Sequence, residues 1–362
     1  MGPASDLLRH LPLVDGHCHF LLDGAPEDLG LYLTEARAPG WDAPAGLAVR
    51  RWCAPALDLP ALASAEDYLA RRAELGHDQV TSRLLRAAGL SDLLVDTGLR
   101  GPRLVPPAPA GAAVHEVVRL ERVAEDLAAT GVTPADFASA YVERLGVACA
   151  GAVATKSIAA YRHGLDLDPA RPAPAEVEAA AGEWLAAPSP RLDHPVLLRF
   201  VLWAGADQGL PVQVHAGFGD RDLTLRGADP ALLQPWLAAV DVPVVLLHCW
   251  PYHRQAGWLA CVYPHVYVDV GLTVAQVGAA AGAVLGEFVE VAPMTKVLFS
   301  TDGYRLPELY LAGAAQFRHS LGQLLDGWVA DGAFAGDDAE RAAALIGGEN
   351  ARRVYRRLRG QG

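Results

Sequence analysis

The second half of the chain alternates short apolar runs with helical stretches, and this pattern limits the folds that the chain can adopt. Residues 211–214 and 242–247 are two such runs, and a histidine follows each directly. Nearly continuous apolar strands between helices are typical of a parallel sheet covered on both faces. The same pattern along the whole chain predicts eight strands, at residues 11–14, 92–96, 116–120, 147–154, 212–215, 244–248, 266–270 and 297–300.

Eight strand–helix units predict an α/β fold, the (β/α)8 or TIM barrel, in which functional residues gather at the carboxyl ends of the strands. We expect one barrel domain over residues 1–362. The long segment after the first strand, residues 21–91, is predicted to be a helical insertion or lid, with Ser64 capping one of its helices. A further helix over residues 338–358 is expected to pack outside the barrel.

Composition limits the kinds of molecule that the protein is expected to bind. The chain has 30 basic and 42 acidic residues, a formal charge of −12, so nucleic acid and anionic membranes are not expected partners. No apolar run reaches the roughly 18 to 20 residues of a membrane helix, and the first residues do not resemble a secretory signal. We therefore expect a soluble cytoplasmic protein acting on a small molecule, with a homo-oligomer left open. The five scattered cysteines indicate buried apolar positions rather than a disulfide framework.

The stretch LPLVDGHCHF contains two histidines that can bind one metal ion. His17 and His19 are two residues apart, so in an extended backbone their rings project to the same face while Cys18 turns away. Further candidate ligands follow the fourth, fifth, sixth and eighth predicted strands, namely Lys156, His215, His248 and Asp302. Their shared placement at strand ends predicts a metal site. Asp302 could take a proton from a water molecule there, or it could instead cap the next helix.

The words around these ligands resemble a known family. They are VQVHAGFGDRDL, VLLHCWPYHRQAGWLACVYPHVYVDVGL and KVLFSTDGYRLPELYLAGA. They are similar to the amidohydrolase superfamily of metal-dependent barrels, and within it to the amidohydrolase-2 branch. More narrowly they resemble amidohydrolase domains that are free-standing or fused to glutamine-synthetase-like domains. This resemblance implies a divalent metal, of the Zn²⁺ type, with Asp302 both binding the metal and accepting the proton of the attacking water.

Lys156 decides between one ion and two. An ordinary ammonium group beside a dication would be repelled, so this lysine either turns away to a carboxylate or is chemically altered. In binuclear members of the superfamily a lysine on the fourth strand is carboxylated and bridges two ions. The resemblance then implies that His17, His19 and Asp302 bind one ion while His215 and His248 bind the other. Other members of the branch use one ion and no lysine.

Substrate contacts are expected from the loops that follow the strands. Arg162 could bind a carboxylate, because a guanidinium group matches that geometry with two hydrogen bonds. Loop packing or helix capping is an alternative for every such residue. Glu116 and Arg119, on the third strand, are expected to form a structural pair or a polar group inside the barrel. The candidate substrate-binding residues are Tyr161, Arg162, Arg221, Trp250 and Tyr252.

Three functions are compatible with these residues. The first is a metal-dependent amidohydrolase that cleaves a C–N bond, an amide, of a small carboxylate-bearing molecule, with Asp302 carrying the proton to the leaving nitrogen. The second is a non-oxidative decarboxylase of an aromatic or unsaturated acid, which the same branch contains. The third is a metal-binding regulatory module without turnover. A barrel fold alone does not choose among them.

Overall fold

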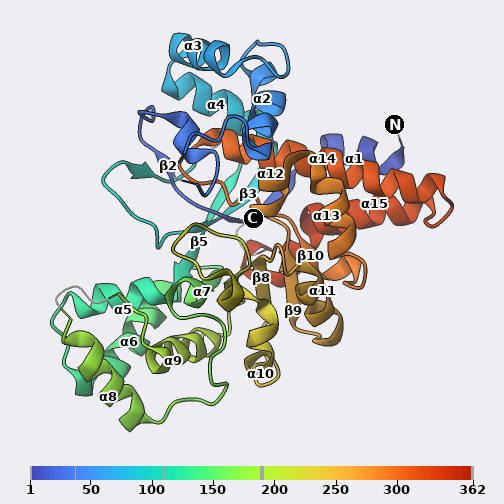
Figure 1. Cartoon of the computed structure of the whole chain (residues 1–362). Helices are drawn as coiled ribbons and strands as arrows, with labels where there is room; N and C mark the ends of the chain where they lie inside the picture. Colours follow the sequence, from blue (N-terminus) through green and yellow to red (C-terminus); the bar gives the residue numbers. More distant parts are fainter. Residues whose placement is uncertain (1, 37, 109–110, 188–190, 360–362) are drawn as a thin grey trace. The chain divides into compact units, whose positions relative to one another are not determined.

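The computed structural model describes residues 2–36, 38–108, 111–187 and 191–359 (Figure 1). The chain divides into two compact units, which we describe separately. The first contains Met1–Val95, Leu99–His115 and Asp269–Arg353, and the second contains Asp96–Gly98, Glu116–Val268 and Val354–Gly362.

Eight strands form one sheet, which confirms the predicted (β/α)8 barrel. Strand β1 pairs in parallel with β3, and β5 to β9 pair in parallel one after another. The amide of Gly16 in β1 donates to the carbonyl of Phe299, which follows β10, at 3.0 Å, so the first and last strands are neighbours. The order is β1 (Leu13–Cys18), β3 (Leu90–Asp96), β5 (Ala113–Arg119), β6 (Ala154–Ser157), β7 (Val212–Ala216), β8 (Val244–His248), β9 (Val266–Asp269) and β10 (Val297–Leu298).

In the first unit, the segment after β1 is helical, as the sequence predicts. Strand β2 (Leu21–Leu22), before the helices, pairs in antiparallel fashion with β4 (Leu104–Val105), which comes after β3. Ser64 caps its predicted helix, since its hydroxyl accepts a hydrogen bond from the amide of Asp67 at 3.0 Å. The helices of this segment are η1 (Leu29–Tyr32), α2 (Pro44–Ala56), α3 (Ala65–Leu75) and α4 (His77–Ala88).

Helices α2 and α4 pack on α14 (Pro307–Ala330), the long helix that follows β10 (Figure 1). A buried ion pair joins the insertion to α14, since Nε of Arg72 in α3 lies 2.7 Å from Oε1 of Glu308 in α14. The Tyr68 hydroxyl donates to the same carboxylate oxygen at 3.2 Å. The insertion is therefore fixed to the helix that begins five residues after Asp302. Other helices of this unit are α1 (Pro3–His10), α12 (Thr273–Val277), α13 (Ala281–Phe288) and α15 (Gly336–Ala344).

In the second unit an aromatic cluster holds the helices that cover its strands. The rings of Phe137, Tyr141, Trp184 and Phe200 lie 5.4 to 6.1 Å apart between centroids. Such edge and tilted contacts add to the burial of large apolar surfaces. The helices are α5 (Leu120–Ala128), α6 (Pro134–Cys149), α7 (Ala159–Arg162), α8 (Pro174–Leu185), α9 (Pro195–Ala206), α10 (Gln234–Leu237) and α11 (His253–Val262).

Three expectations differ from the structure. The strand predicted at 147–154 is wrong: α6 continues to Cys149, where Val147 is 75% exposed, and the strand β6 occupies Ala154–Ser157. The helix predicted at 338–358 is interrupted by a π-helical turn at Leu345–Glu349. Arg119 does not pair with Glu116, because its guanidinium binds Asp96 at 2.6 and 3.1 Å. Among the described residues, no helix is both long and apolar enough to cross a membrane.

Candidate metal centre

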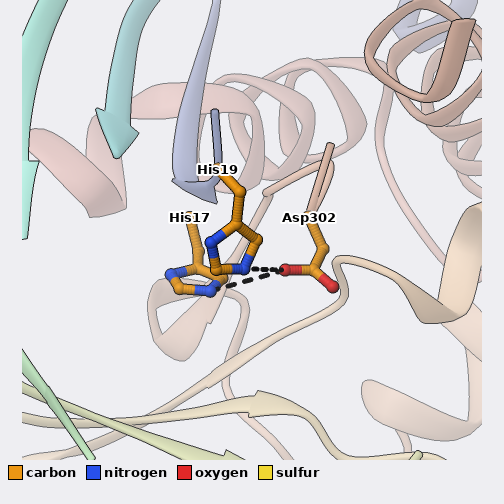
Figure 2. Close-up of side chains that lie close together, drawn as sticks. All are labelled: His17, His19 and Asp302. Atoms are coloured by element: carbon orange, nitrogen blue, oxygen red, sulfur yellow. Dashed lines mark ion pairs between the residues drawn. The ribbon is translucent and has the colours of Figure 1, made fainter. Parts of the chain in front are cut away.

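Three predicted ligands of the first unit converge on one point. Nε2 of His17 and Nε2 of His19 lie 3.4 and 3.2 Å from Oδ1 of Asp302 (Figure 2). His17 is fully buried, His19 is 7% exposed, and the side chain of Asp302 is 13% exposed. The two imidazole rings meet edge to face with centroids 4.9 Å apart. The alternation expected of an extended backbone therefore places both rings beside the carboxylate.

Backbone hydrogen bonds hold these residues together. The amide of Asp302 donates to the carbonyl of His17 at 3.0 Å, and the amide of His19 donates to the carbonyl of Gly303 at 2.8 Å. Asp302 has φ +51°, in the left-handed region that aspartate tolerates better than most residues. Helix α14 begins at Pro307 with Leu306 as its N-cap, so Asp302 does not cap it. The carboxylate is left to face the histidines.

The donor set fits a divalent metal ion. One atom from each of His17, His19 and Asp302 lies within 4.8 Å of the other two. Imidazole nitrogen and carboxylate oxygen are the donors that Zn²⁺ binds, and three protein ligands with an open position are typical of catalytic sites. Nδ1 of His19 is buried and has no hydrogen-bond partner among the described residues. The residues therefore fit the group that the sequence predicts.

Asp15 is a functional residue that the sequence interpretation missed. Its buried carboxylate accepts hydrogen bonds from the amide of Thr301 at 2.9 Å and from the Thr301 hydroxyl. The Thr301 hydroxyl in turn accepts from the amide of Gly303 at 3.0 Å. Burial raises the pKa of Asp15 to about 8, against the lowering effect of Thr301. The sequence spacing could have indicated this residue, because Asp15 is two residues before His17 and so shares its face of the strand.

The second unit gathers the other predicted ligands. The rings of His215 in β7 and His248 at the end of β8 lie 4.7 Å apart, and both residues are buried. Lys156 in β6 is 1% exposed. Burial, followed by the charges of His248 and Lys156, holds the pKa of His215 well below its usual range. A neutral imidazole is the form that binds metals.

Two further features of this second cluster are consistent with ligand binding. Nε2 of His215 is buried and has no hydrogen-bond partner among the residues described. His248 and Cys249 both have positive φ, +65° and +66°, which is unusual for such side chains. The amide of Cys249 donates to the carbonyl of Ala216 at 2.9 Å, which helps to fix this conformation. Strained backbone of this kind concentrates at functional sites.

The predicted substrate-binding residues have varied surroundings. The ring of Tyr161 lies 4.5 Å from that of His215, and its hydroxyl accepts from the amide of Asp220 at 3.3 Å. Arg162 is paired with Glu125 at 2.9 Å and is largely buried, and burial lowers the pKa of its guanidinium. The Glu125 carboxylate already contacts this guanidinium group. The role of Arg162 in binding a substrate carboxylate therefore stays a prediction.

The other three predicted residues lie in loops of the same unit. Arg221 is exposed. Trp250 packs on Phe218 with ring centroids 5.6 Å apart, and Tyr252 directly precedes α11. The amide of Trp250 donates to the carbonyl of the candidate ligand His248 at 2.9 Å, a backbone contact that does not involve the Trp250 side chain. Their roles in substrate binding therefore stay predictions.

A barrel of eight parallel strands with histidine and aspartate ligands at the strand ends defines the class of metal-dependent barrel enzymes. The chain belongs to the amidohydrolase family, whose family model matches residues 14–357. This confirms the resemblance read from the sequence.

Three individual relatives show similarity of different extent. A solved structure from Lactobacillus casei, assigned as a metal-dependent hydrolase, has 30% identity and a TM-score of 0.88, with both chains covered completely. The glucuronate isomerase of Caulobacter crescentus has 14% identity and a TM-score of 0.70, over 98% of this chain and 93% of its own, and so shows the fold alone. Protein fluG of Emericella nidulans is 36% identical over 219 residues, which are 56% of this chain. The match spans a quarter of the length of fluG.

Proposed function

We propose that this protein is a metal-dependent amidohydrolase that cleaves a C–N bond of a small carboxylate-bearing amide. The observation that carries the proposal is the position of Asp302 Oδ1, which lies 3.2 to 3.4 Å from two imidazole nitrogens. The family and the structural relative assigned as a metal-dependent hydrolase support a divalent ion at this position. We propose zinc, because the donors are two imidazoles and one carboxylate.

A divalent ion bound here would lower the pKa of a bound water molecule toward 7 and would polarise a carbonyl group. The side chains have separate tasks in this scheme. His17 and His19 bind through Nε2, and their burial keeps bulk water away from that face. Asp302 is the general base: it accepts the proton of the attacking water and then donates it to the leaving nitrogen. Its backbone bond to His17 keeps the carboxylate in reach.

The second unit supports a two-ion form of the proposal. His215 offers a neutral imidazole and His248 lies beside it, and we propose that Lys156, as its carboxylated form, is a ligand as well. An anionic carboxylated lysine removes the repulsion that an ammonium group would cause beside a dication. The supporting observations are the burial of all three side chains and the unpaired Nε2 of His215.

The test compares zinc-loaded wild-type protein with His19→Ala and Asp302→Asn on a panel of small carboxylate-bearing amides. We expect amine release by the wild type and a loss of roughly 100-fold or more in kcat for each variant, with circular dichroism unchanged. Carbon dioxide release from aromatic acids without amine release would instead favour the decarboxylase. An active His19→Ala protein would overturn the proposed metal centre. Absence of turnover on all panels by fully metallated protein would favour the regulatory module.

A further inference from the structure

Arg305 is a strained arginine close to the candidate metal centre. It follows Asp302 by three residues and has φ +64°, a left-handed conformation that is unfavourable for a long side chain. Its amide donates to the carbonyl of Phe20 at 2.8 Å, and its carbonyl accepts from the amide of Leu22 at 2.9 Å. Arg305 is therefore fixed against the segment that directly follows His19.

Two tyrosines position its side chain. The guanidinium carbon lies 4.7 Å from the ring centroid of Tyr304 and 5.0 Å from that of Tyr32 in η1. The other neighbour of Tyr304 is His19, whose ring centroid is 5.7 Å away. A single aromatic ring thus separates the guanidinium group from a proposed metal ligand. Cation–π contacts hold the group in place but leave its in-plane N–H donors unused.

Among the described residues, Arg305 lacks the carboxylate partner that three other arginines have. Arg72, Arg119 and Arg162 are each paired with a carboxylate, those of Glu308, Asp96 and Glu125. The Nε of Arg305 is buried without a hydrogen-bond partner, and its side chain forms no ion pair with the residues that the structure describes. Burying an unpaired N–H of a cation costs free energy. Arg305 as a whole residue is only partly buried, which is compatible with access by a ligand.

We propose that Arg305 binds the carboxylate of the substrate whose amide lies at His17, His19 and Asp302. This inference rests on the proposed function and deepens it by naming the residue that selects acidic substrates. A guanidinium group binds a carboxylate with two parallel hydrogen bonds, which also fixes the orientation of the ligand.

The test measures the binding of benzoate and of benzamide, which has the same shape without the charge, by isothermal titration calorimetry. It uses both metal-free and zinc-loaded full-length protein, so binding is measured without turnover. We compare the wild type with Arg305→Gln and Arg305→Lys. The matched control is Arg51→Gln, because the Arg51 guanidinium also lies on an aromatic ring, that of Trp52 at 4.3 Å, and contacts His319 far along α14.

We expect Arg305→Gln to weaken benzoate binding at least tenfold in both metal states, because a charge-assisted bidentate contact is lost. Arg305→Lys should weaken it less, and neither change should affect benzamide. Arg51→Gln should bind both probes like the wild type. Unchanged benzoate affinity in Arg305→Gln, or a wild type that does not prefer benzoate over benzamide, would overturn the role of Arg305. Since no step requires catalysis, that result is distinguishable from failure of the amide-cleavage proposal.

Where Arg305→Gln does not fold, Arg305→Lys decides the outcome, because it keeps the charge and removes the bidentate geometry. Its benzoate affinity must then fall several-fold relative to the wild type. Equal affinity in a folded Arg305→Lys protein would assign Arg305 only the packing of Tyr32 and Tyr304.

Discussion

Replacement of Asp15 by alanine tests how the metal centre is held. The change removes the acceptor of two buried donors of Thr301, its amide and its hydroxyl, and of a third, longer hydrogen bond from the amide of His17 at 3.4 Å. Each buried donor left without a partner costs about 1–3 kcal/mol, so we expect a loss of roughly 2–6 kcal/mol in the free energy of unfolding. Thr301 also orders the amide of Gly303, whose carbonyl binds the amide of His19.

The same change should weaken metal binding. Without Asp15, the 301–303 segment that carries Asp302 is less firmly held against β1, and the left-handed conformation of Asp302 is less well supported. We expect zinc affinity to fall by about tenfold or more, the lower end of the effect of removing groups that orient metal ligands. Asp15→Asn keeps one acceptor for the amide of Thr301 and should lose less in both measurements.

The assays are urea unfolding and zinc competition with a chromophoric chelator. The control is Asn350→Ala, since the buried amide of Asn350 also makes two hydrogen bonds, to the carbonyls of Met294 and Val297 at 2.7 and 2.8 Å. Val297 begins β10, at the end away from Asp302. We expect this control to lose stability but to bind zinc normally once folded. An Asp15→Ala protein with wild-type zinc affinity would refute the role of Asp15 in positioning the ligands.

Two other substitutions examine separate parts of the molecule. Lys156→Ala should reduce bound zinc from two equivalents per chain to one or fewer. Inductively coupled plasma mass spectrometry measures this content. One equivalent in both the wild type and the variant would refute the two-ion form. Glu308→Leu should cost about 3–5 kcal/mol in urea unfolding because it leaves the buried Arg72 unpaired, whereas the double change Glu308→Leu with Arg72→Met should cost much less. Equal costs for the single and double variants would contradict the view that the unpaired charge causes the loss.

Local signals in the sequence predicted much of the fold. Apolar runs located the strands that end at His215 and His248, and the N-cap at Ser64 located α3. The fourth strand was misplaced because residues 147–154 consist of small and apolar residues that suit a helix end as well as a strand. Val147 is 75% exposed on α6, so this apolar run does not mark a buried strand. The irregular turn at Leu345–Glu349 contains two glycines, which helical periodicity alone does not place.

The candidate site was predictable where a ligand ends a strand and less so where its role depends on distant contacts. His17, His19 and Asp302 are recognisable from their residue types and positions, and the structure brings them together. The sequence does not indicate the proposed role of Arg305 in substrate binding. That role depends on the contact with Tyr32 in the insertion and on the lack of a carboxylate partner among the described residues, and both follow from the fold. The charge of Arg162 indicates that it can bind a carboxylate. That this carboxylate is Glu125 depends on the fold.

The hydrogen bonds between β1 and the segment after β10 have a consequence for how the protein matures. Asp15 and Thr301 are 286 positions apart, so the metal ligands of the first unit meet only after nearly the whole chain has been synthesised and the last strand has docked. Closing so long a loop is slow compared with forming local helices. A metal ion that requires Asp302 as well as His17 and His19 would bind only late in assembly. Metal uptake during refolding would therefore report ring closure directly, as a late kinetic phase.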